Sequence, residues 1–360
     1  MNILGIETSC DETAAAVVRD GREVLSNVVY TQIPLHQPYG GVVPEIASRA
    51  HIEKISEVVR ECLRPLSSCG LHSDSDIRGS GFRIDAVAVT YGPGLSPALI
   101  VGLNAAKGVA KGLGVPLMGI HHIEAHLHTP FLDSELNPLE AMPALGLAIS
   151  GGNTRWVDMS AYGRYEVIGE TLDDAAGEAF DKAAKLLGLG YPGGPKVDRI
   201  SKQYIEEKGL GDLIPFPKGR PRDGVTALAG LPAELCVSFS GLKTSLLRYV
   251  QKEKPTEADI PRIVASYQEA IVQAVADRTR TALRRKRYRS LIVGGGVSLN
   301  SRIRAVLADV VREAGVELLL AKPKYTGDNG AMIAGLAYYR RNHVEDAMSL
   351  DVNPCLEVGG

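Results

Sequence analysis

The first 130 residues alternate short apolar runs with longer stretches of helical periodicity. The polar pair Asp20-Gly21 lies between two apolar runs and predicts a tight hairpin. One strand (2–8) is predicted before this hairpin. After the hairpin, the pattern predicts a helix (44–63), a strand (84–92), a second helix (92–114) and a last strand (116–122). The last of these strands leads directly into a short helix rich in histidine. The pattern is therefore three strands, then helix, strand, helix and strand.

The same order of elements restarts near residue 144. Two strands joined by a Gly-Gly turn (144–160) and a third strand (165–171) are followed by an alanine-rich helix (173–187). A long helix (261–287) and a strand (290–296) come next, and a further helix, strand and helix finish the chain. Two copies of one unit predict two related α/β lobes with a cleft between them. The chain should cross from one lobe to the other near 130–143.

Composition limits the class of protein. The 360 residues are 45% hydrophobic and 23% charged, as in an ordinary soluble globular protein. A net charge of −2 gives no general attraction to nucleic acid or membranes, so a polyanionic partner would need a local basic patch. Five scattered cysteines without a CxxC pair predict reduced thiols in the cytoplasm. There is no pattern of a signal peptide or of a membrane-spanning helix. The Ser-, Gly- and Asp-rich segment 67–83 predicts a surface loop.

Histidines dominate the stretch "IHHIEAHLHT" (120–129). At about 100° per residue, His122 and His126 lie about 40° apart on one helix face, which suits two ligands of one metal ion. Glu124 lies about 200° from His122, so it is not the general base of an HExxH metallopeptidase on this helix. A purely structural pair of histidines is the alternative.

Two histidines leave a metal site incomplete. "YTGDNGAMIA" places Asp328 in a turn before a helix, and this residue is the candidate third ligand. His121 and His128 point away from the metal face and are expected to be structural.

Two polar turns occupy matching positions of the repeat, "GIETSCDET" (5–13) and "AISGGNT" (148–154). Hydroxyl and backbone N–H groups in such turns can cradle a phosphate, although ordinary polar hairpins look similar. "IVGGGVSLN" (292–300) is a strand, three glycines and a helix start. Its glycines would let a ligand lie against the backbone, but a plain strand-to-helix turn also favours glycine.

Acidic and basic clusters complete the candidates. Asp174, Glu178 and Asp181 fall on one stripe of the predicted helix, either as a solvated face or with one acid turned towards a bound sugar. The glycine-rich turn "GYPGGP" behind them favours the second interpretation. "RTALRRKRYRS" (280–290) has five positive charges from Arg284 to Arg289. They form either a phosphate-binding patch or the charged end of a helix that complements its dipole.

Several long motifs occur together. They are "GIETSCDETAAAVV", "YGGVVPEIASRAH", "GPGLSPALIVG", "HHIEAH", "DDAAGEAFDKAAKLLGLGYPGGP", "SFSGLKT", "GGGVSLN" and "TGDNGAMIA". In colinear order from Ile3 to about Tyr339, this set resembles the bacterial TsaD proteins, also called Gcp or YgjD. The resemblance implies a two-lobed actin/hexokinase/Hsp70-like (ASKHA) fold of duplicated ribonuclease-H-like domains with a central cleft. The N-terminal lobe would be 1–130, completed by a helix at about 331–350, and the C-terminal lobe 131–330.

The resemblance also implies an activity, a metal ion and partners. The family is an acyltransferase of tRNA processing that moves the threonylcarbamoyl group of threonylcarbamoyl-AMP to N6 of adenosine 37, in tRNAs that read codons starting with A. The product is t6A. One metal ion per subunit, iron (Fe²⁺) or zinc (Zn²⁺), is bound through the positions of His122, His126 and Asp328. The family works in the cytoplasm, away from membranes, with TsaB on the N-terminal lobe and the ATPase TsaE. A separate synthase, TsaC or a relative, supplies the donor.

Substrate-binding positions carry over from the family as well. The turn formed by Ala148, Ile149, Ser150, Gly151 and Gly152 would hold phosphate or carbamoyl groups. Asp181, Gly194 and Asp198 would approach the ribose or threonyl part, with Asn300 beside the nucleotide. A carboxylate that takes a proton from the adenine amine would help the transfer, and we assign Asp11 as base or positioning group with Glu12 in support.

The chain departs from the family in two places. Asn153 replaces the histidine of the usual SGGHT motif and cannot titrate near neutral pH. Segment 67–83 is longer than the usual loop. Three alternatives to the transferase are a small-molecule kinase of the same fold, a non-enzymatic scaffold and a metallopeptidase. A kinase or a scaffold has no need of the HxxxH pair, and the register of Glu124 disfavours a metallopeptidase.

Overall fold

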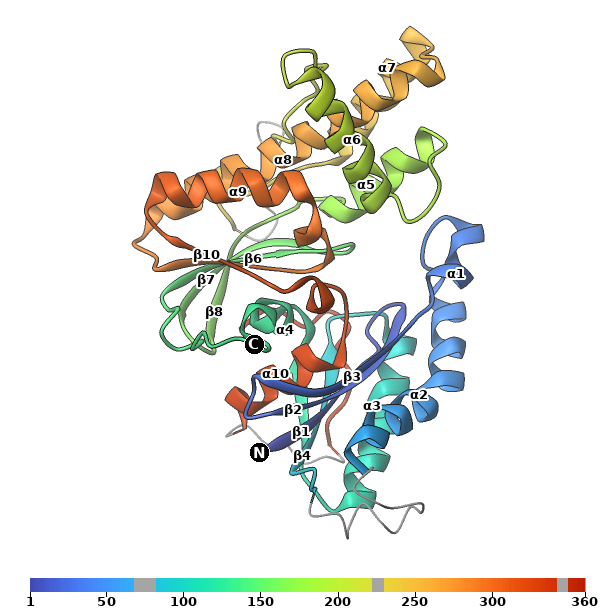
Figure 1. Ribbon diagram of the computed structural model, residues 1–360, viewed down its shortest axis with the longest axis vertical. Helices are drawn as coiled ribbons and strands as arrows, with labels where there is room; N and C mark the ends of the chain where they lie inside the picture. Colours follow the sequence, from blue (N-terminus) through green and yellow to red (C-terminus); the bar gives the residue numbers. More distant parts are fainter. Residues whose placement is uncertain (68–81, 222–229, 342–348, 360) are drawn as a thin grey trace. The chain divides into compact units, whose positions relative to one another are not determined.

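The computed structural model describes residues 1–67, 82–221, 230–341 and 349–359 (Figure 1). The chain forms two compact units. Unit 1 is Met1–Glu140 with Ala321–Gly360, and unit 2 is Ala141–Leu320. Most of the predicted loop 67–83 lies outside the described residues. The helix predicted at about 331–350 ends at Arg340, residues 342–348 lie outside the described residues, and 349–350 are not helical. No described helix has both the length and the apolar character that crossing a membrane needs.

Unit 1 is built on a five-stranded sheet of order β3-β2-β1-β4-β5. Its strands are β1 (Asn2–Glu7), β2 (Glu12–Arg19), β3 (Glu23–Thr31), β4 (Ala86–Gly92) and β5 (Leu117–His121). The first three pair antiparallel, and β1, β4 and β5 pair parallel. Asp20 and Gly21 both have positive φ, 49° and 73°, as a two-residue hairpin turn requires. The predicted hairpin is therefore confirmed.

Unit 2 repeats this wiring in a sheet of order β10-β9-β6-β7-β8. The strands are β6 (Ala144–Ile149), β7 (Thr154–Ala161), β8 (Arg164–Glu170), β9 (Ser290–Gly294) and β10 (Glu317–Leu320). Again the first three pair antiparallel and the last two add in parallel. Both units thus have the ribonuclease-H-like strand order, and the duplication predicted from the hydrophobic pattern is confirmed.

Helices cover the sheets of both units (Figure 1). Unit 1 has α1 (Ile33–His36), α2 (Pro44–Ser67), α3 (Ser96–Leu113), α4 (His122–His128) and α10 (Gly330–Arg340). Unit 2 has α5 (Ala176–Leu186), α6 (Gly194–Lys208), α7 (Ser240–Glu253), α8 (Ile260–Arg285) and α9 (Ser301–Ala314). The hydrophobic pattern did not predict α6 or α7. Each of these helices buries only two side chains, so its apolar stripe is too narrow to stand out.

Helix α10 packs directly on the backbone of the first sheet. A Cβ atom on Gly5 would lie 2.3 Å from the carbonyl oxygen of Gly330, and one on Gly330 would lie 2.5 Å from the amide nitrogen of Ala16. Only glycine permits this approach. The close contact attaches the last helix of the chain to its first strand.

The boundaries of the units differ from those predicted. Residues 131–140 and 321–330 belong to unit 1 instead of the second lobe. The reason is a cluster of polar contacts around Asp133. Its carboxylate accepts hydrogen bonds from Lys324 (2.8 Å), Tyr325 (2.6 Å) and the amide of Val24 (3.0 Å). Asp328 follows this cluster and therefore lies in the same unit as the histidine helix.

His128 fastens the end of α4 to the β2–β3 turn. Its side chain is 1% exposed, and Nε2–H donates to the carbonyl of Gly21 at 2.9 Å. Burial lowers the pKa of this imidazole to about 4, and the hydrogen bond to Gly21 opposes that effect only in part. The folded protein therefore keeps His128 neutral at neutral pH.

This burial predicts a component of acid sensitivity. Below pH 6.5 the unfolded chain binds a proton at His128, whereas the folded chain binds it only near pH 4, so stability is lost as pH falls through this window. The loss amounts to about 3 kcal/mol. His128→Gln keeps a donor for Gly21 but cannot titrate. Urea unfolding at pH 7 and pH 4.5 should show a smaller pH-dependent loss in the variant than in the wild type. Equal losses would contradict the assignment.

Candidate functional site

Helix α4 starts directly at the end of β5, and a histidine caps it. Nδ1 of His121 accepts hydrogen bonds from the amides of Ile123 (3.1 Å) and Glu124 (3.3 Å). These are first-turn amides that have no partner within the helix. His121 at one end and His128 at the other thus have the structural roles expected of them.

Glu124 contacts a different part of unit 1 from the histidine pair. Its carboxylate is 2% exposed and accepts hydrogen bonds from the side chain of Arg340 on α10 and from the amide of Gly359 at 3.1 Å. The helical register predicted that this residue lies off the metal face. Its contacts agree, and they leave it no role as a base beside the histidines.

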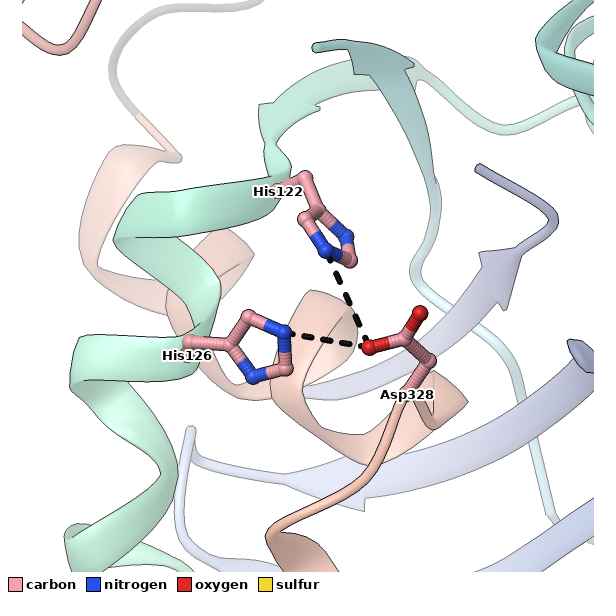
Figure 2. Close-up of side chains that lie close together, drawn as sticks. All are labelled: His122, His126 and Asp328. Carbon is pink, nitrogen blue, oxygen red and sulfur yellow. Dashed lines mark ion pairs between the residues drawn. The ribbon is translucent and has the colours of Figure 1, made fainter. Parts of the chain in front are cut away.

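Three side chains of unit 1 converge on one point (Figure 2). His122 and His126 extend from α4, and Asp328 lies in the segment before α10. Oδ1 of Asp328 is 3.1 Å from Nε2 of His126 and 3.7 Å from Nε2 of His122. Ligand atoms about 2.1 Å from a tetrahedral metal ion are about 3.4 Å apart, so this spacing matches a metal site.

The environment of His126 supports the same interpretation. Its side chain is 2% exposed, and neither ring nitrogen makes a hydrogen bond of ordinary geometry with the residues that the structure describes. A buried polar atom without a partner is costly. A metal ion bound to Nε2 would remove that cost, so the residues present fit a divalent cation.

The charges around His122 also favour a cation. Burial would lower the pKa of this imidazole, but the carboxylates of Asp328 and Glu7 raise it to about 9. Burial would raise the pKa of Asp328, but His122 and His126 lower it to about 2. Two buried carboxylates thus require a positive charge between them, which either a proton or a metal ion can supply.

Asp11 and Glu12 lie at the start of β2 in the same unit. Asp11 is 9% exposed, and its carbonyl oxygen accepts a hydrogen bond from the amide of Gln32 at 3.0 Å. Burial raises the pKa of Glu12 well above its ordinary value, and the negative charges of Asp328 and Asp11 raise it further. The two acids are therefore electrostatically coupled to the histidine–aspartate cluster.

Unit 2 contains a pocket of about 530 Å³. Among the predicted substrate-binding residues, those that line it are Gly151, Asp181, Gly194, Asp198 and Asn300. Ala148 and Ile149 are buried in β6, and Ser150 and Gly152 are not among the lining residues. The structure therefore brings together the acids, Asn300 and two glycines, but only one residue of the predicted phosphate turn.

Hydrogen bonds fix the polar side chains of this pocket. Asp181 accepts one from the amide of Gly193 at 2.7 Å. Asp198 accepts from the amide (3.1 Å) and the hydroxyl (2.8 Å) of Ser301, and the side chain of Asn300 caps α9. These contacts hold the carboxylates in place at the pocket wall.

The predicted acidic stripe is wrong in one respect. Helix α5 begins at Ala176, so Asp174 precedes it. Asp174 and Glu178 both pair with Lys182, at 2.6 and 2.7 Å. These two acids therefore form a surface ion-pair group, and only Asp181 of the three lines the pocket.

The two glycines that follow β9 have different roles. Gly295 has φ 98°, and a Cβ atom there would lie 2.4 Å from the carbonyl oxygen of Ile149. Gly296 lines the pocket, and nothing lies within 4 Å of where its Cβ would be. The first glycine is thus needed for packing against β6, and the second leaves space for a ligand.

Asn153, which stands where the resembling family has a histidine, closes the β6–β7 turn. Its carbonyl oxygen accepts from the amide of Ser150 at 2.8 Å, and its amide donates to the hydroxyl of Ser150 at 3.2 Å. Both contacts use the backbone of Asn153, so any residue can make them.

The search for polar motifs missed two kinds of residue. Phe180, Pro192, Val297 and Leu299 line the pocket with apolar surface. Nothing in their sequence context separates them from core residues. Glu7, which contacts His122, was missed although a single acid at the end of a buried strand is an unusual pattern.

The basic run ends α8 and continues beyond it. Lys286 pairs with Asp158 at 2.9 Å, so its charge is already partnered. Arg284, Arg285, Arg287 and Arg289 are exposed. Arg284 and Arg285 lie in the last helical turn, where they complement the dipole. All five charged side chains are therefore exposed, and Lys286 among them is held in an ion pair.

Comparison with known proteins gives a consistent result. A family model described as "TsaD: tRNA N6-adenosine threonylcarbamoyltransferase" matches residues 23–335. A Clostridium perfringens protein with the name tRNA N6-adenosine threonylcarbamoyltransferase is 44% identical over 363 residues, covering 99% of this chain and 98% of the relative. A Clostridium botulinum protein of the same name is 44% identical over 365 residues, covering 100% of this chain and 98% of the relative.

The similarity to solved structures concerns the fold. HypF from T. kodakarensis matches 96% of this chain with a TM-score of 0.58 at 16% identity. The match covers 49% of HypF, so the chain spans about half of that protein.

Substituting Gly295 and Gly296, the two glycines that follow β9, tests whether one is needed for packing and the other only leaves space in the pocket. Gly295→Ala should lower the free energy of unfolding by about 2 kcal/mol or more, because alanine is strained at positive φ and its Cβ would meet Ile149. Gly296→Ala should change it by less than about 0.5 kcal/mol. Urea denaturation measures both values. Similar losses in the two variants would contradict the separate roles.

Proposed function

Since this chain belongs to the TsaD family of tRNA N6-adenosine threonylcarbamoyltransferases, and is thus a transferase that forms t6A in tRNA, we propose that its donor is threonylcarbamoyl-AMP. The acceptor is N6 of adenosine 37 in tRNAs that read codons starting with A. The cluster of His122, His126 and Asp328 supports this chemistry most directly. A kinase of this fold or a non-enzymatic scaffold would not require such a cluster.

His122, His126 and Asp328 hold one divalent ion in this proposal. Two imidazoles and one carboxylate suit Fe²⁺ and Zn²⁺, and three protein ligands leave coordination positions open for substrate. Such an ion would act as a Lewis acid on the carbonyl of the mixed anhydride.

The pocket of unit 2 takes the ribose or threonyl part of the donor. The carboxylates of Asp181 and Asp198 accept hydrogen bonds from hydroxyl groups there. The apolar side chains of Phe180 and Leu299 offer surface to the adenine ring, with Asn300 beside it. Ser150, Gly151 and Gly152 take phosphate or carbamoyl oxygens through their turn.

Asp11 takes the proton that adenosine N6 loses, or positions the amine, and Glu12 supports it. The raised pKa of Glu12 favours this division, because Glu12 then holds a proton where an ordinary glutamate has lost it. Protonated Glu12 can donate a hydrogen bond to Asp11, and the pair avoids two adjacent negative charges.

TsaB and TsaE are the proposed protein partners, and a TsaC-type synthase supplies the donor in the cytoplasm, where the tRNA substrate is made. Unit 1 has large exposed apolar side chains, which include Val29, Leu35, Tyr39, Ile52 and Ile100, and TsaB would cover some of them.

The metal assignment predicts the loss of activity in single variants. His122→Ala and Asp328→Ala should each reduce t6A formation at least 100-fold, because each removes one of three ligands. The assay is reconstitution with tRNA, threonine, bicarbonate, ATP and partner proteins, with t6A detected by mass. Asp309→Ala, which removes an exposed acid of α9, is the control and should keep full activity. Undiminished t6A in the two ligand variants would refute the metal assignment.

The exposed arginines of the basic run are the proposed tRNA contact. Replacing Arg284, Arg285 and Arg287 by Gln should weaken tRNA binding, and the slope of log K against log salt should become shallower by about 2. Filter binding over a salt series measures both. The control replaces Lys208, Lys252 and Lys254, which are exposed and carry the same total charge. If both triple variants weaken tRNA binding equally, the arginines have no specific contact with tRNA, and only their interaction with the helix dipole remains.

A further inference from the structure

Glu7 is a buried carboxylate that the proposed activity does not use. It ends β1, the central strand of the unit 1 sheet, and its side chain is 0% exposed. Moving an ionised carboxylate into such a place is costly unless other groups compensate its charge and lone pairs. The contacts of Glu7 therefore indicate what it does.

Three hydrogen-bond donors surround this carboxylate. The amide of Ser9 donates to Oε1 at 2.5 Å, and the hydroxyl of Thr90 on β4 donates to Oε2. Nδ1 of His122 lies 3.2 Å from Oε2 and 3.1 Å from the hydroxyl oxygen of Ser9. An ionised carboxylate only accepts and a hydroxyl oxygen can accept, so an Nδ1–H on His122 satisfies both contacts. Ser9 and Thr90 thus hold the carboxylate while it holds the imidazole.

The opposite nitrogen of the same ring faces the metal cluster. Nε2 of His122 is directed at Asp328, with 3.7 Å between Nε2 and Oδ1. With the proton fixed on Nδ1, a neutral His122 has its lone pair on Nε2, where a metal ion requires it. Glu7, His122 and the metal position then form a carboxylate–histidine–metal series.

We propose that Glu7 is the positioning residue of the metal site, fixing the ring orientation and tautomer of His122. This inference rests on the metal site proposed above. It makes the two histidines unequal, because Nδ1 of His126, the ring nitrogen that is not directed at Asp328, has no hydrogen-bond partner among the described residues. A carboxylate holds Nδ1 of His122, and none holds Nδ1 of His126.

The test measures Zn²⁺ affinity by chelator competition in the full-length chain. Glu7→Leu should weaken Zn²⁺ binding 10- to 100-fold, the usual effect of losing such a partner. Glu7→Gln keeps one acceptor oxygen and the side-chain volume, so it should fall between the wild type and Glu7→Leu. If Glu7→Leu folds poorly, Zn²⁺ affinity can still be measured in Glu7→Gln. Wild-type affinity in both variants would overturn the proposal.

A double-mutant cycle separates positioning from general loosening of the fold. In a His122→Ala background, Glu7→Leu should have no further effect on Zn²⁺ affinity, because the ring on which it acts is absent. The same loss in both backgrounds would overturn the proposal. Glu124→Gln is the matched control, since it alters another buried carboxylate of unit 1 that touches neither ligand ring. It should bind Zn²⁺ within about threefold of wild type, and a loss as large as that of Glu7→Leu would overturn the proposal.

Co²⁺ absorption spectra provide a second readout that does not depend on activity. The visible bands of bound Co²⁺ should shift in Glu7→Gln, because the hydrogen bond at Nδ1 alters the donor strength of Nε2. An unchanged spectrum would count against the proposal. Failure of the metal site itself looks different. If wild type and His122→Ala bind Zn²⁺ equally, the metal site is refuted and this inference with it.

Discussion

The close backbone contact between α10 and β1 is the constraint on which unit 1 depends. Gly5 and Gly330 have no Cβ atoms, so helix and strand approach to a distance that no other residue would allow. Asp328 directly precedes this helix. Packing, and not attraction between charged groups, therefore brings its carboxylate to the histidine pair on α4. The same helix also contacts α4 through a hydrogen bond that the side chain of Arg340 donates to the carboxylate of Glu124.

Electrostatic balance is the second organising feature. Glu7 and Asp328 lie beside the imidazole of His122, and the negative charge of Asp328 adds to burial in raising the pKa of Glu12. A protonated His122 relieves part of this excess of negative charge, and a divalent ion would relieve more. The folded protein is thus electrostatically prepared to bind a cation. The free energy gained by packing the sheet offsets the free-energy cost of burying the acids.

Sequence periodicity predicted the succession of strands in both units, because strands buried in a sheet and the Asp20-Gly21 turn have strong local signatures. It also predicted the pairing of His122 with His126, which follows from helix geometry alone. It did not place Asp328 in unit 1, because that depends on long-range contacts such as Asp133 with Tyr325. Nor did it identify Phe180 as a pocket residue, because an apolar lining resembles a core. Helices α6 and α7 were not predicted, because their narrow apolar stripes give no clear helical periodicity in the sequence.

Unit 1 is discontinuous, and this has a consequence for biosynthesis. A ribosome makes the histidine helix early, then the whole of unit 2, and only afterwards the segment that carries Asp328 and α10. Until that segment emerges, the nascent chain has two of the three clustered side chains, and β1 lacks the helix that packs on it. The cluster is therefore completed only after the whole of unit 2 has been synthesised.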